Sequence, residues 1–232
     1  MSEGIELRGL AQRFGRRWVL RGLDARVERG EVIALTGRNG SGKTTLLRIC
    51  GTLLRPTRGT GIVFGLDLVR QAGAIRERVG MLAHDAGLYA TLTAEENLEF
   101  AQRMSGRSAD HRAIAGALET VGLGGHQRER VGGFSAGMRR RLALARLLLR
   151  PPSLLLLDEP YASFDVDGIE LVNAFTLAVA RAGGIALIAT HDLPRARSVM
   201  SRRLHIENGR FSEPGPLTEA SFAGAIDEDT GG

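Results

Sequence analysis

The stretch GRNGSGKT, Gly37 to Thr44, decides the fold because it matches the phosphate-binding pattern G-x-x-x-x-G-K-[ST] at every fixed position. The apolar run Val32 to Leu35 before it predicts a strand, and a helix after it is predicted by the spacing of Leu46, Leu47, Ile49 and Leu53. Glycines let such a loop curl until successive N–H groups point at phosphate oxygens, and the following helix presents its positive N-terminus to the same anion. We therefore expect a nucleotide site in which Lys43 reaches the β- and γ-phosphates and the Thr44 hydroxyl ligates Mg²⁺.

A second apolar run, LLLLDEP (Leu154 to Pro160), places two carboxylates at the end of a buried strand. Ligands bind beyond the carboxyl ends of strands in open α/β sheets, so Asp158 is expected to hold Mg²⁺ directly or through water. Glu159 can polarise a water molecule for in-line attack on the γ-phosphate. A phosphate-binding loop alone does not distinguish kinases, GTPases and motor-like ATPases, and this carboxylate pair narrows the choice.

Strand and helix patterns alternate along much of the chain, which predicts an α/β fold with a P-loop core and a mostly parallel sheet. GIALIATHD (Gly184 to Asp192) predicts another buried strand, and helices are expected over Ser135 to Leu149 and about Val166 to Arg181. Near the N-terminus, Ile5 to Glu31 alternates apolar and polar residues between glycine-containing turns. This segment predicts a small antiparallel sheet.

The middle of the chain, about residues 84–133, predicts a helical insertion. Thr93 and Glu96 form a capping-box pattern at its first helix, and no strand pattern follows. We expect residues 1–212 to form a single domain that contains this insertion. The tail, residues 213–232, is rich in proline, glycine and acidic residues and is expected to be partly disordered.

The composition is that of an ordinary soluble protein, with 232 residues, 43% hydrophobic and 25% charged, and a net charge of +5. The single cysteine, Cys50, excludes an intramolecular disulfide framework and favours a reducing compartment. The N-terminus lacks a basic segment followed by an apolar one, and no apolar run approaches the ~20 residues that span a bilayer. A cytoplasmic location is expected.

The stretch FSAGMRRRLALAR (Phe134 to Arg146) joins small residues to a block of arginines and an apolar helix. Clustered arginines attract nucleic-acid backbones, whereas a serine hydroxyl, a glycine N–H and a helix N-terminus form an anion site. The segment FSAGM resembles the signature loop of the ATP-binding-cassette (ABC) ATPases, usually Leu-Ser-Gly-Gly-Gln, and the helix and strand that follow it continue the resemblance. The likeness extends from about Ile5 to Arg210.

The resemblance implies that two copies of the chain pack head to tail. Ser135, Ala136 and Gly137 of one copy would then face the γ-phosphate held by the other. The arginines would lie mostly on the helix surface, and no nucleic-acid partner is expected. An integral membrane permease is the implied partner, which would place the chain at the inner face of the cell membrane.

Roles for individual residues follow from the same resemblance. Lys43 would bind phosphate, Thr44 and Asp158 would hold Mg²⁺, Glu159 would be the general base, and His191 would orient the attacking water. His84 stands where most members carry glutamine, and an imidazole can take over its hydrogen bonds. The expected ATP-binding residues are Phe14, which would stack on adenine, then Gly37, Asn39, Gly40, Ser41, Gly42, Lys43, Thr44, Thr45, Ser135, Ala136, Gly137 and Asp165.

Three segments also resemble one subfamily, the ATP-binding subunits of the haem exporter used in cytochrome c maturation. They are AHDAGLYATLTAEENLEF, FSAGMRRRLALARLLL and LLLLDEPYASFD. Substrate specificity in such transporters lies in the membrane subunits. Drug, polysaccharide or lipid exporters therefore remain alternatives within the family, and a soluble ABC protein acting on ribosomes or DNA is the alternative of a different class.

Overall fold

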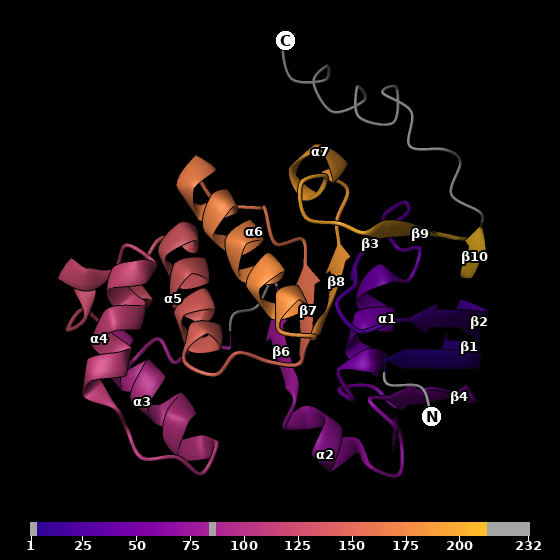
Figure 1. Ribbon diagram of the computed structural model, residues 1–232, viewed down its shortest axis with the longest axis horizontal. Helices are drawn as coiled ribbons and strands as arrows, with labels where there is room; N and C mark the ends of the chain where they lie inside the picture. Colours follow the sequence, from indigo (N-terminus) through magenta and orange to yellow (C-terminus); the bar gives the residue numbers. More distant parts are fainter. Residues whose placement is uncertain (1–3, 84–86, 213–232) are drawn as a thin grey trace, which may run out of the picture.

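Two sheets and two groups of helices make up the fold in the computed structural model, which describes residues 4–83 and 87–212 (Figure 1). The larger sheet has six strands in the order β10-β9-β3-β8-β7-β6. All neighbours in it are parallel except β10, which runs antiparallel to β9. Its strands are β3 (Val32–Thr36), β6 (Val79–Leu82), β7 (Leu154–Asp158), β8 (Ile185–Ala189), β9 (Arg202–Glu207) and β10 (Arg210–Ser212).

The three central strands explain why this sheet lies inside the molecule. Every residue of β3, β7 and β8 is buried, as expected for strands covered on both faces. Side chains alternate between the faces, so Leu155 and Leu157 belong to one apolar cluster and Leu154 and Leu156 to the other. The parallel arrangement brings the carboxyl ends of all three strands to one edge.

A smaller, four-stranded antiparallel sheet has the order β2-β1-β4-β5. The predicted antiparallel segment supplies β1 (Ile5–Phe14) and β2 (Arg17–Val27). The other two strands, β4 (Arg58–Val63) and β5 (Leu66–Asp67), were not predicted. This sheet shares one apolar cluster with the larger sheet, so the two sheets form a single core.

Helices cover both faces of the larger sheet (Figure 1). The helix after the phosphate-binding loop, α1, packs in the apolar cluster that includes the small sheet, and α5 and α6 pack in the other cluster. The helices are α1 (Lys43–Cys50), α2 (Ala72–Arg76), α3 (Ala94–Met104), α4 (His111–Thr120), α5 (Ala136–Leu148), α6 (Val166–Arg181) and α7 (Leu193–Ala196). The predicted helices over residues 135–149 and 166–181 are thus confirmed.

The expected position of Leu53 on the first helix is wrong. Helix α1 ends at Cys50, and Thr52 adopts a φ of 57° in the left-handed region, which does not continue a right-handed helix. Leu53 consequently lies outside the helix and is 64% exposed.

The middle of the chain forms a helical arm, as predicted. Helix α3 begins with the capping box, since the Thr93 hydroxyl accepts the Glu96 N–H and the Glu96 carboxylate accepts the Thr93 N–H. Two 3₁₀ turns follow α4, at Gly124–His126 and Val131–Gly133, and the only strand pairing in the described part of this arm is an isolated bridge. The described part of the arm is therefore helical.

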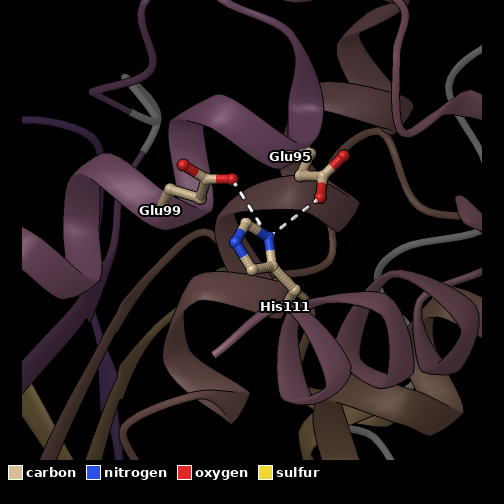
Figure 2. Close-up of side chains that lie close together, drawn as sticks. All are labelled: Glu95, Glu99 and His111. Atoms are coloured by element: carbon tan, nitrogen blue, oxygen red, sulfur yellow. Dashed lines mark hydrogen bonds and ion pairs between the residues drawn. The ribbon is translucent and has the colours of Figure 1, made fainter. Parts of the chain in front are cut away.

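A histidine ties the two helices of the arm together. His111, the first residue of α4, points its Nδ1 at the carboxylates of Glu95 and Glu99 on α3, at 3.3 Å from each (Figure 2). Among the described residues, this is the one group of three or more His, Cys, Asp or Glu side chains whose ligand atoms all lie within 4.8 Å of one another. Here the acidic oxygens have the imidazole as their partner.

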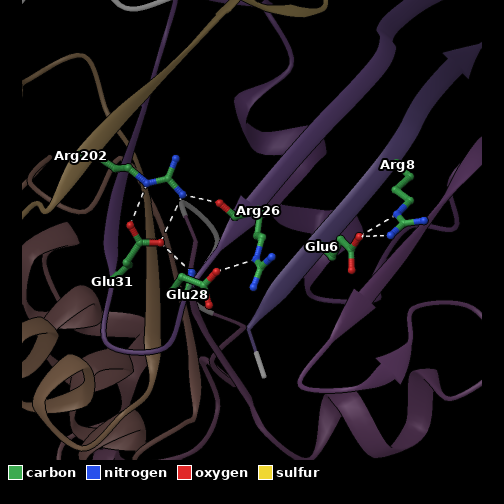
Figure 3. Close-up of polar contacts among 6 residues, drawn as sticks. All are labelled: Glu6, Arg8, Arg26, Glu28, Glu31 and Arg202. Carbon is green, nitrogen blue, oxygen red and sulfur yellow. Dashed lines mark hydrogen bonds and ion pairs between the residues drawn. The ribbon is translucent and has the colours of Figure 1, made fainter. Parts of the chain in front are cut away.

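A second polar cluster lies at the amino ends of β3 and β9, beside the carboxyl end of β2 (Figure 3). Arg202 at the start of β9 donates through Nε to Glu31 at 2.8 Å, and it also donates to the main-chain oxygen of Arg26. This hydrogen bond from Arg202 lowers the pKa of Glu31. The cluster joins the two sheets at the edge opposite to the phosphate-binding loop.

Two further expectations concerned membrane-spanning helices and the C-terminal tail. Within residues 4–83 and 87–212, no helix has both the length and the apolar character needed to span a bilayer. The expected disordered tail, residues 213–232, lies outside the described residues.

Candidate active site

The loop between β3 and α1 is shaped by glycines at positions where other residues do not fit. Gly37 and Gly42 have φ values of 138° and 115°. A Cβ atom on Gly37 would lie 2.3 Å from the Ile206 carbonyl oxygen, and one on Gly42 would lie 2.4 Å from the Leu20 side chain. Glycine at both positions lets the main chain curl tightly, as a loop that binds phosphate through its N–H groups requires.

Gly37→Ala is therefore expected to distort the loop and to weaken ATP binding by at least about tenfold, because the clashing atom is main chain and the φ is strained for alanine. Gly116→Ala is the matched control: Gly116 lies in α4, and apart from its chain neighbours and the backbone of its own helix nothing lies within 4 Å of the position that its new methyl group would take. It should bind ATP normally and gain about 0.5–1 kcal/mol of unfolding free energy. Isothermal titration with ATP and thermal unfolding measure both effects.

Lys43 lies folded across the loop. Its side chain is buried, and its Nζ donates to the Gly37 carbonyl at 2.7 Å. Nearby, the Ser41 hydroxyl is buried and has no hydrogen-bond partner among the described residues. A buried cation beside an unpaired hydroxyl fits a site that receives a phosphate group.

The expected Mg²⁺ ligands, Thr44 and Asp158, come together from positions 114 residues apart, with Thr44 Oγ1 donating to Asp158 Oδ1 at 2.9 Å. A hydroxyl paired with a carboxylate is the oxygen donor set that Mg²⁺ takes beside a nucleotide phosphate. Both residues line a cleft of about 330 Å³. The cleft is lined by Arg17, Val19, Asn39, Gly40, Gly42, Lys43, Thr44, Thr45, Asp158 and Glu159.

Glu159 stands at the junction of β7 with the loop that follows. Its main chain has a φ of 48°, in the left-handed region that a residue with a side chain rarely adopts, and its N–H donates to the Ala189 carbonyl at 2.8 Å. Its carboxylate lies 2.9 Å from Nδ1 of His191, whose side chain is exposed. The predicted base and the predicted water-orienting residue are therefore in direct contact.

Two hydrogen bonds connect the segment that follows His191 with the segment that follows Glu159. The buried Tyr161 hydroxyl donates to Asn173 on α6 at 2.9 Å, and the Asn173 amide donates to the Arg195 carbonyl on α7 at 3.0 Å. Burial raises the pKa of Tyr161, so the hydroxyl remains a donor. This chain of bonds holds α7, which directly follows His191, in a defined place.

The signature residues lie at the start of α5. Ser135 is the N-cap, and its hydroxyl accepts the Met138 N–H at 3.2 Å. Ser135 and Ala136 are exposed, and a Cβ on Gly137 would lie 3.0 Å from the Ser163 carbonyl. The described lining of the P-loop cleft does not include these three residues, so in one copy of the chain they stand apart from Lys43.

Two other predicted ligands have different surroundings. Asp165 caps α6 by accepting the Gly168 N–H at 3.0 Å and also accepts from Arg141; the Gly168 bond is the main cause of its lowered pKa. Phe14 ends β1 with 51% of its surface exposed. Two cleft residues that sequence reasoning missed, Arg17 and Val19, begin the next strand. No sequence motif identifies these two residues, because only the pairing of β1 with β2 brings them to the cleft.

The arginine block is not mostly helix surface, and this expectation is wrong. Arg140 is 4% exposed and donates to the Glu159 carbonyl at 2.8 Å. Arg141 donates to the Val121 carbonyl at 2.9 Å, and Arg146 donates to the Gly87 carbonyl at 3.3 Å. Guanidinium groups along α5 thus bond to main-chain oxygens of other segments.

The remaining predicted site residue, His84, lies outside the described residues.

Comparison with known proteins identifies the family of this chain. Residues 20–162 match the ABC transporter family. The cytochrome c biogenesis ATP-binding export protein CcmA of Xanthomonas axonopodis pv. citri is 45% identical over 80% of this chain and 85% of its own length. The daunorubicin resistance ATP-binding protein DrrA3 of Streptomyces coeruleorubidus is 39% identical over 93% of this chain and 69% of its own. The predicted resemblance to the CcmA subfamily is confirmed.

Solved structures have the same fold. The ATP-binding cassette MJ0796, a dimer in a post-hydrolysis state bound to ADP and Pi, has a TM-score of 0.82 and 23% identity and covers 92% of this chain and 99% of its own. An ATP-binding subunit of an ABC transporter, with a TM-score of 0.82 and 27% identity, covers 95% of each chain. From the family match, the close relatives and the converging cleft residues, we conclude that this chain belongs to the ABC transporter family, as one of its ATP-binding subunits with ATPase activity.

Proposed function

We propose that two copies of this chain hydrolyse Mg–ATP at sites shared between them and thereby drive a membrane permease of a CcmA-like haem export system for cytochrome c biogenesis. The observation that carries the proposal is the convergence of Lys43, Thr44, Asp158 and Glu159 in one cleft. Such a cleft holds the phosphates of a nucleotide and the water that attacks them. We place the chain in the cytoplasm, at the inner face of the membrane that holds the permease.

The chemistry of the cleft follows from these side chains. Lys43 and the loop N–H groups bind the β- and γ-phosphates, and Thr44 and Asp158 would hold Mg²⁺, which would neutralise phosphate charge. Glu159 takes a proton from the attacking water as the water oxygen bonds to the γ-phosphorus and the bond from that phosphorus to the bridging oxygen breaks, releasing ADP and phosphate. His191, 2.9 Å from Glu159, orients the same water. His84 is proposed to contribute at the cleft in place of the usual glutamine.

Head-to-tail packing of two copies is supported by the place of the signature residues. Ser135 and Ala136 are exposed at the N-terminus of a 13-residue helix, where partial positive charge attracts an anion. In the proposed dimer, Ser135, Ala136 and Gly137 face the γ-phosphate bound by the partner, and Asp165 lies in the loop between the two nucleotides. We propose that Phe14 stacks on the adenine.

A groove beside the helical arm is the proposed permease contact. It has a volume of about 290 Å³ and lies between β6, the end of α3 and the end of α5. Exposed aromatic side chains lie on the same arm: Tyr89 is 51% exposed and contacts Phe100 edge-on at 4.8 Å between ring centroids. Strand β6 ends at Leu82, two residues before His84 in the sequence, so the groove adjoins the start of the loop that is expected to sense ATP.

The cargo is inferred from the relatives. CcmA proteins of two Xanthomonas species are 44–45% identical over most of the chain, which supports export in cytochrome c biogenesis. The match to DrrA3, which spans more of this chain, favours a drug exporter as the second candidate.

The test is to replace a bacterial ccmA gene with the gene for this chain. Restored c-type cytochromes and co-purification with the host's membrane subunits are expected. A chain that hydrolyses ATP yet restores no cytochrome, and instead raises daunorubicin resistance when expressed with its own permease, would favour the drug exporter. ATP hydrolysis stimulated by RNA or DNA, with no membrane partner recovered, would favour the soluble class.

A further inference from the structure

Arg140 is a charged residue inside the protein, shortly beyond the signature loop on α5. Only 4% of its surface is exposed. Its Nη1 donates to the main-chain oxygen of Glu159 at 2.8 Å, and its Nη2 has no hydrogen-bond partner within the described residues. Burying a guanidinium is costly unless it is paired, so this placement needs a reason.

The acceptor of this bond is a residue whose backbone is constrained in the site. The φ of 48° at Glu159 turns the chain sharply at the end of β7, and such a conformation persists only where neighbours hold it. Three hydrogen bonds hold its main chain here: the Glu159 N–H donates to the Ala189 carbonyl on β8, and the Glu159 carbonyl accepts from Arg140 on α5 at 2.8 Å and from the Ala162 N–H at 3.4 Å. The bond from Arg140 is the shorter of the two at the carbonyl, and it depends on one side chain.

Electrostatics favour the same pairing. Burial lowers the pKa of Arg140, and the negative charges of Asp158 and Glu159 oppose that change. Since an arginine is protonated far above neutral pH, the side chain keeps its positive charge beside both carboxylates. The negative charges of the two acidic groups of the cleft therefore offset part of the cost of burying Arg140.

We propose that Arg140 is a positioning residue for hydrolysis: anchored on the signature helix, its guanidinium holds the main chain of Glu159 so that the carboxylate is aimed at the attacking water. The link is short, since Ser135 and Arg140 belong to one continuous helix whose N-terminus is proposed to meet the partner's nucleotide. A shift of that helix would reach Glu159 through a single hydrogen bond. This inference rests on the proposed role of Glu159 as general base.

The test compares Arg140→Met with wild type in ATP titrations and steady-state hydrolysis. Lys43 and the loop are untouched, so the ATP Kd and KM should stay within about twofold of wild type. The kcat should fall about tenfold or more, because small misplacements of a catalytic group have large effects on rate. Arg140→Lys, which restores a charged donor, should recover part of the loss.

Arg202→Met is the matched control. It removes a guanidinium that also bonds to a main-chain oxygen, that of Arg26, and to one carboxylate, that of Glu31, but at the amino ends of β3 and β9 (Figure 3). Its melting temperature can be compared directly with that of Arg140→Met, and its kcat should equal that of wild type. A similar loss of kcat in Arg202→Met would mean that general loosening of the fold, not positioning, explains the Arg140 effect.

A double variant separates positioning from structure. In a Glu159→Gln background there is no base to aim, so adding Arg140→Met should lower the residual rate less than about twofold. Should Arg140→Met not fold, Arg140→Gln is interpreted in the same way. A kcat within about twofold of wild type in the folded variant would overturn the proposal, since positioning effects are larger. If Glu159→Gln itself hydrolyses ATP normally, the general-base assignment fails instead, so the two failures are distinguishable.

Discussion

Glu159→Gln is expected to bind ATP as tightly as wild type and to lose hydrolysis by ~10²-fold or more, the scale of a positioned acid–base group. Glutamine has nearly the same shape as glutamate and can keep the contact to His191, which is 2.9 Å from the carboxylate in the wild type. It cannot accept a proton from the attacking water. The variant should therefore retain bound ATP, and by size-exclusion chromatography it should elute as a dimer only when ATP is present.

The control for this variant is Glu129→Gln, which makes the same change in the helical arm. Glu129 is an exposed partner of His126, at 2.9 Å, and it does not line the cleft. It should hydrolyse ATP at the wild-type rate and should not trap a dimer. Unchanged turnover in Glu159→Gln would remove this residue from the mechanism.

Mixing two inactive variants is expected to restore hydrolysis. Lys43→Ala removes the cation that neutralises phosphate in its own cleft, and Ser135→Arg blocks the signature surface proposed to meet the partner's nucleotide. A heterodimer of the two has one site with both an intact Lys43 and an intact Ser135. Activity well above the sum of the separate variants should appear on mixing, and wild-type specific activity should rise with protein concentration.

Ser135→Arg also removes a helix cap, which is typically worth about 1 kcal/mol, so stability needs a control. Asp110→Ala provides it, because Asp110 caps α4 by accepting the Ala113 N–H at 3.0 Å and is not part of the signature loop. This variant should lose comparable stability and keep its activity. A wild type whose specific activity does not depend on concentration, together with an inert mixture, would contradict the shared site.

Much of the fold could be predicted from the sequence because its signals are local. Three signals each lie within one short segment: the phosphate-binding loop, the carboxylates after a buried strand and the capping box at Thr93. The spacing of the hydrophobic residues predicted the bounds of α5 and α6 almost to the residue. Strands β4, β5, β6, β9 and β10 were missed. Their patterns are short, and pairing with distant strands decides such segments.

Contacts between distant segments decided the rest. Thr44 meets Asp158 across 114 residues because parallel strands end at one edge of the sheet, and the residue types at both positions had already indicated that meeting. No residue pattern had indicated which arginine of α5 would be buried. Successive helix positions point in different directions, and a charged residue is ordinarily exposed. Arg140 is buried with its guanidinium bonded to the Glu159 carbonyl, and the negative charges of Asp158 and Glu159 at the end of β7 offset part of the cost of removing its charge from water. The sequence by itself determined the family's nucleotide-binding segments, whereas only the tertiary structure decided which arginine meets them, since that depends on the groups that folding brings around it.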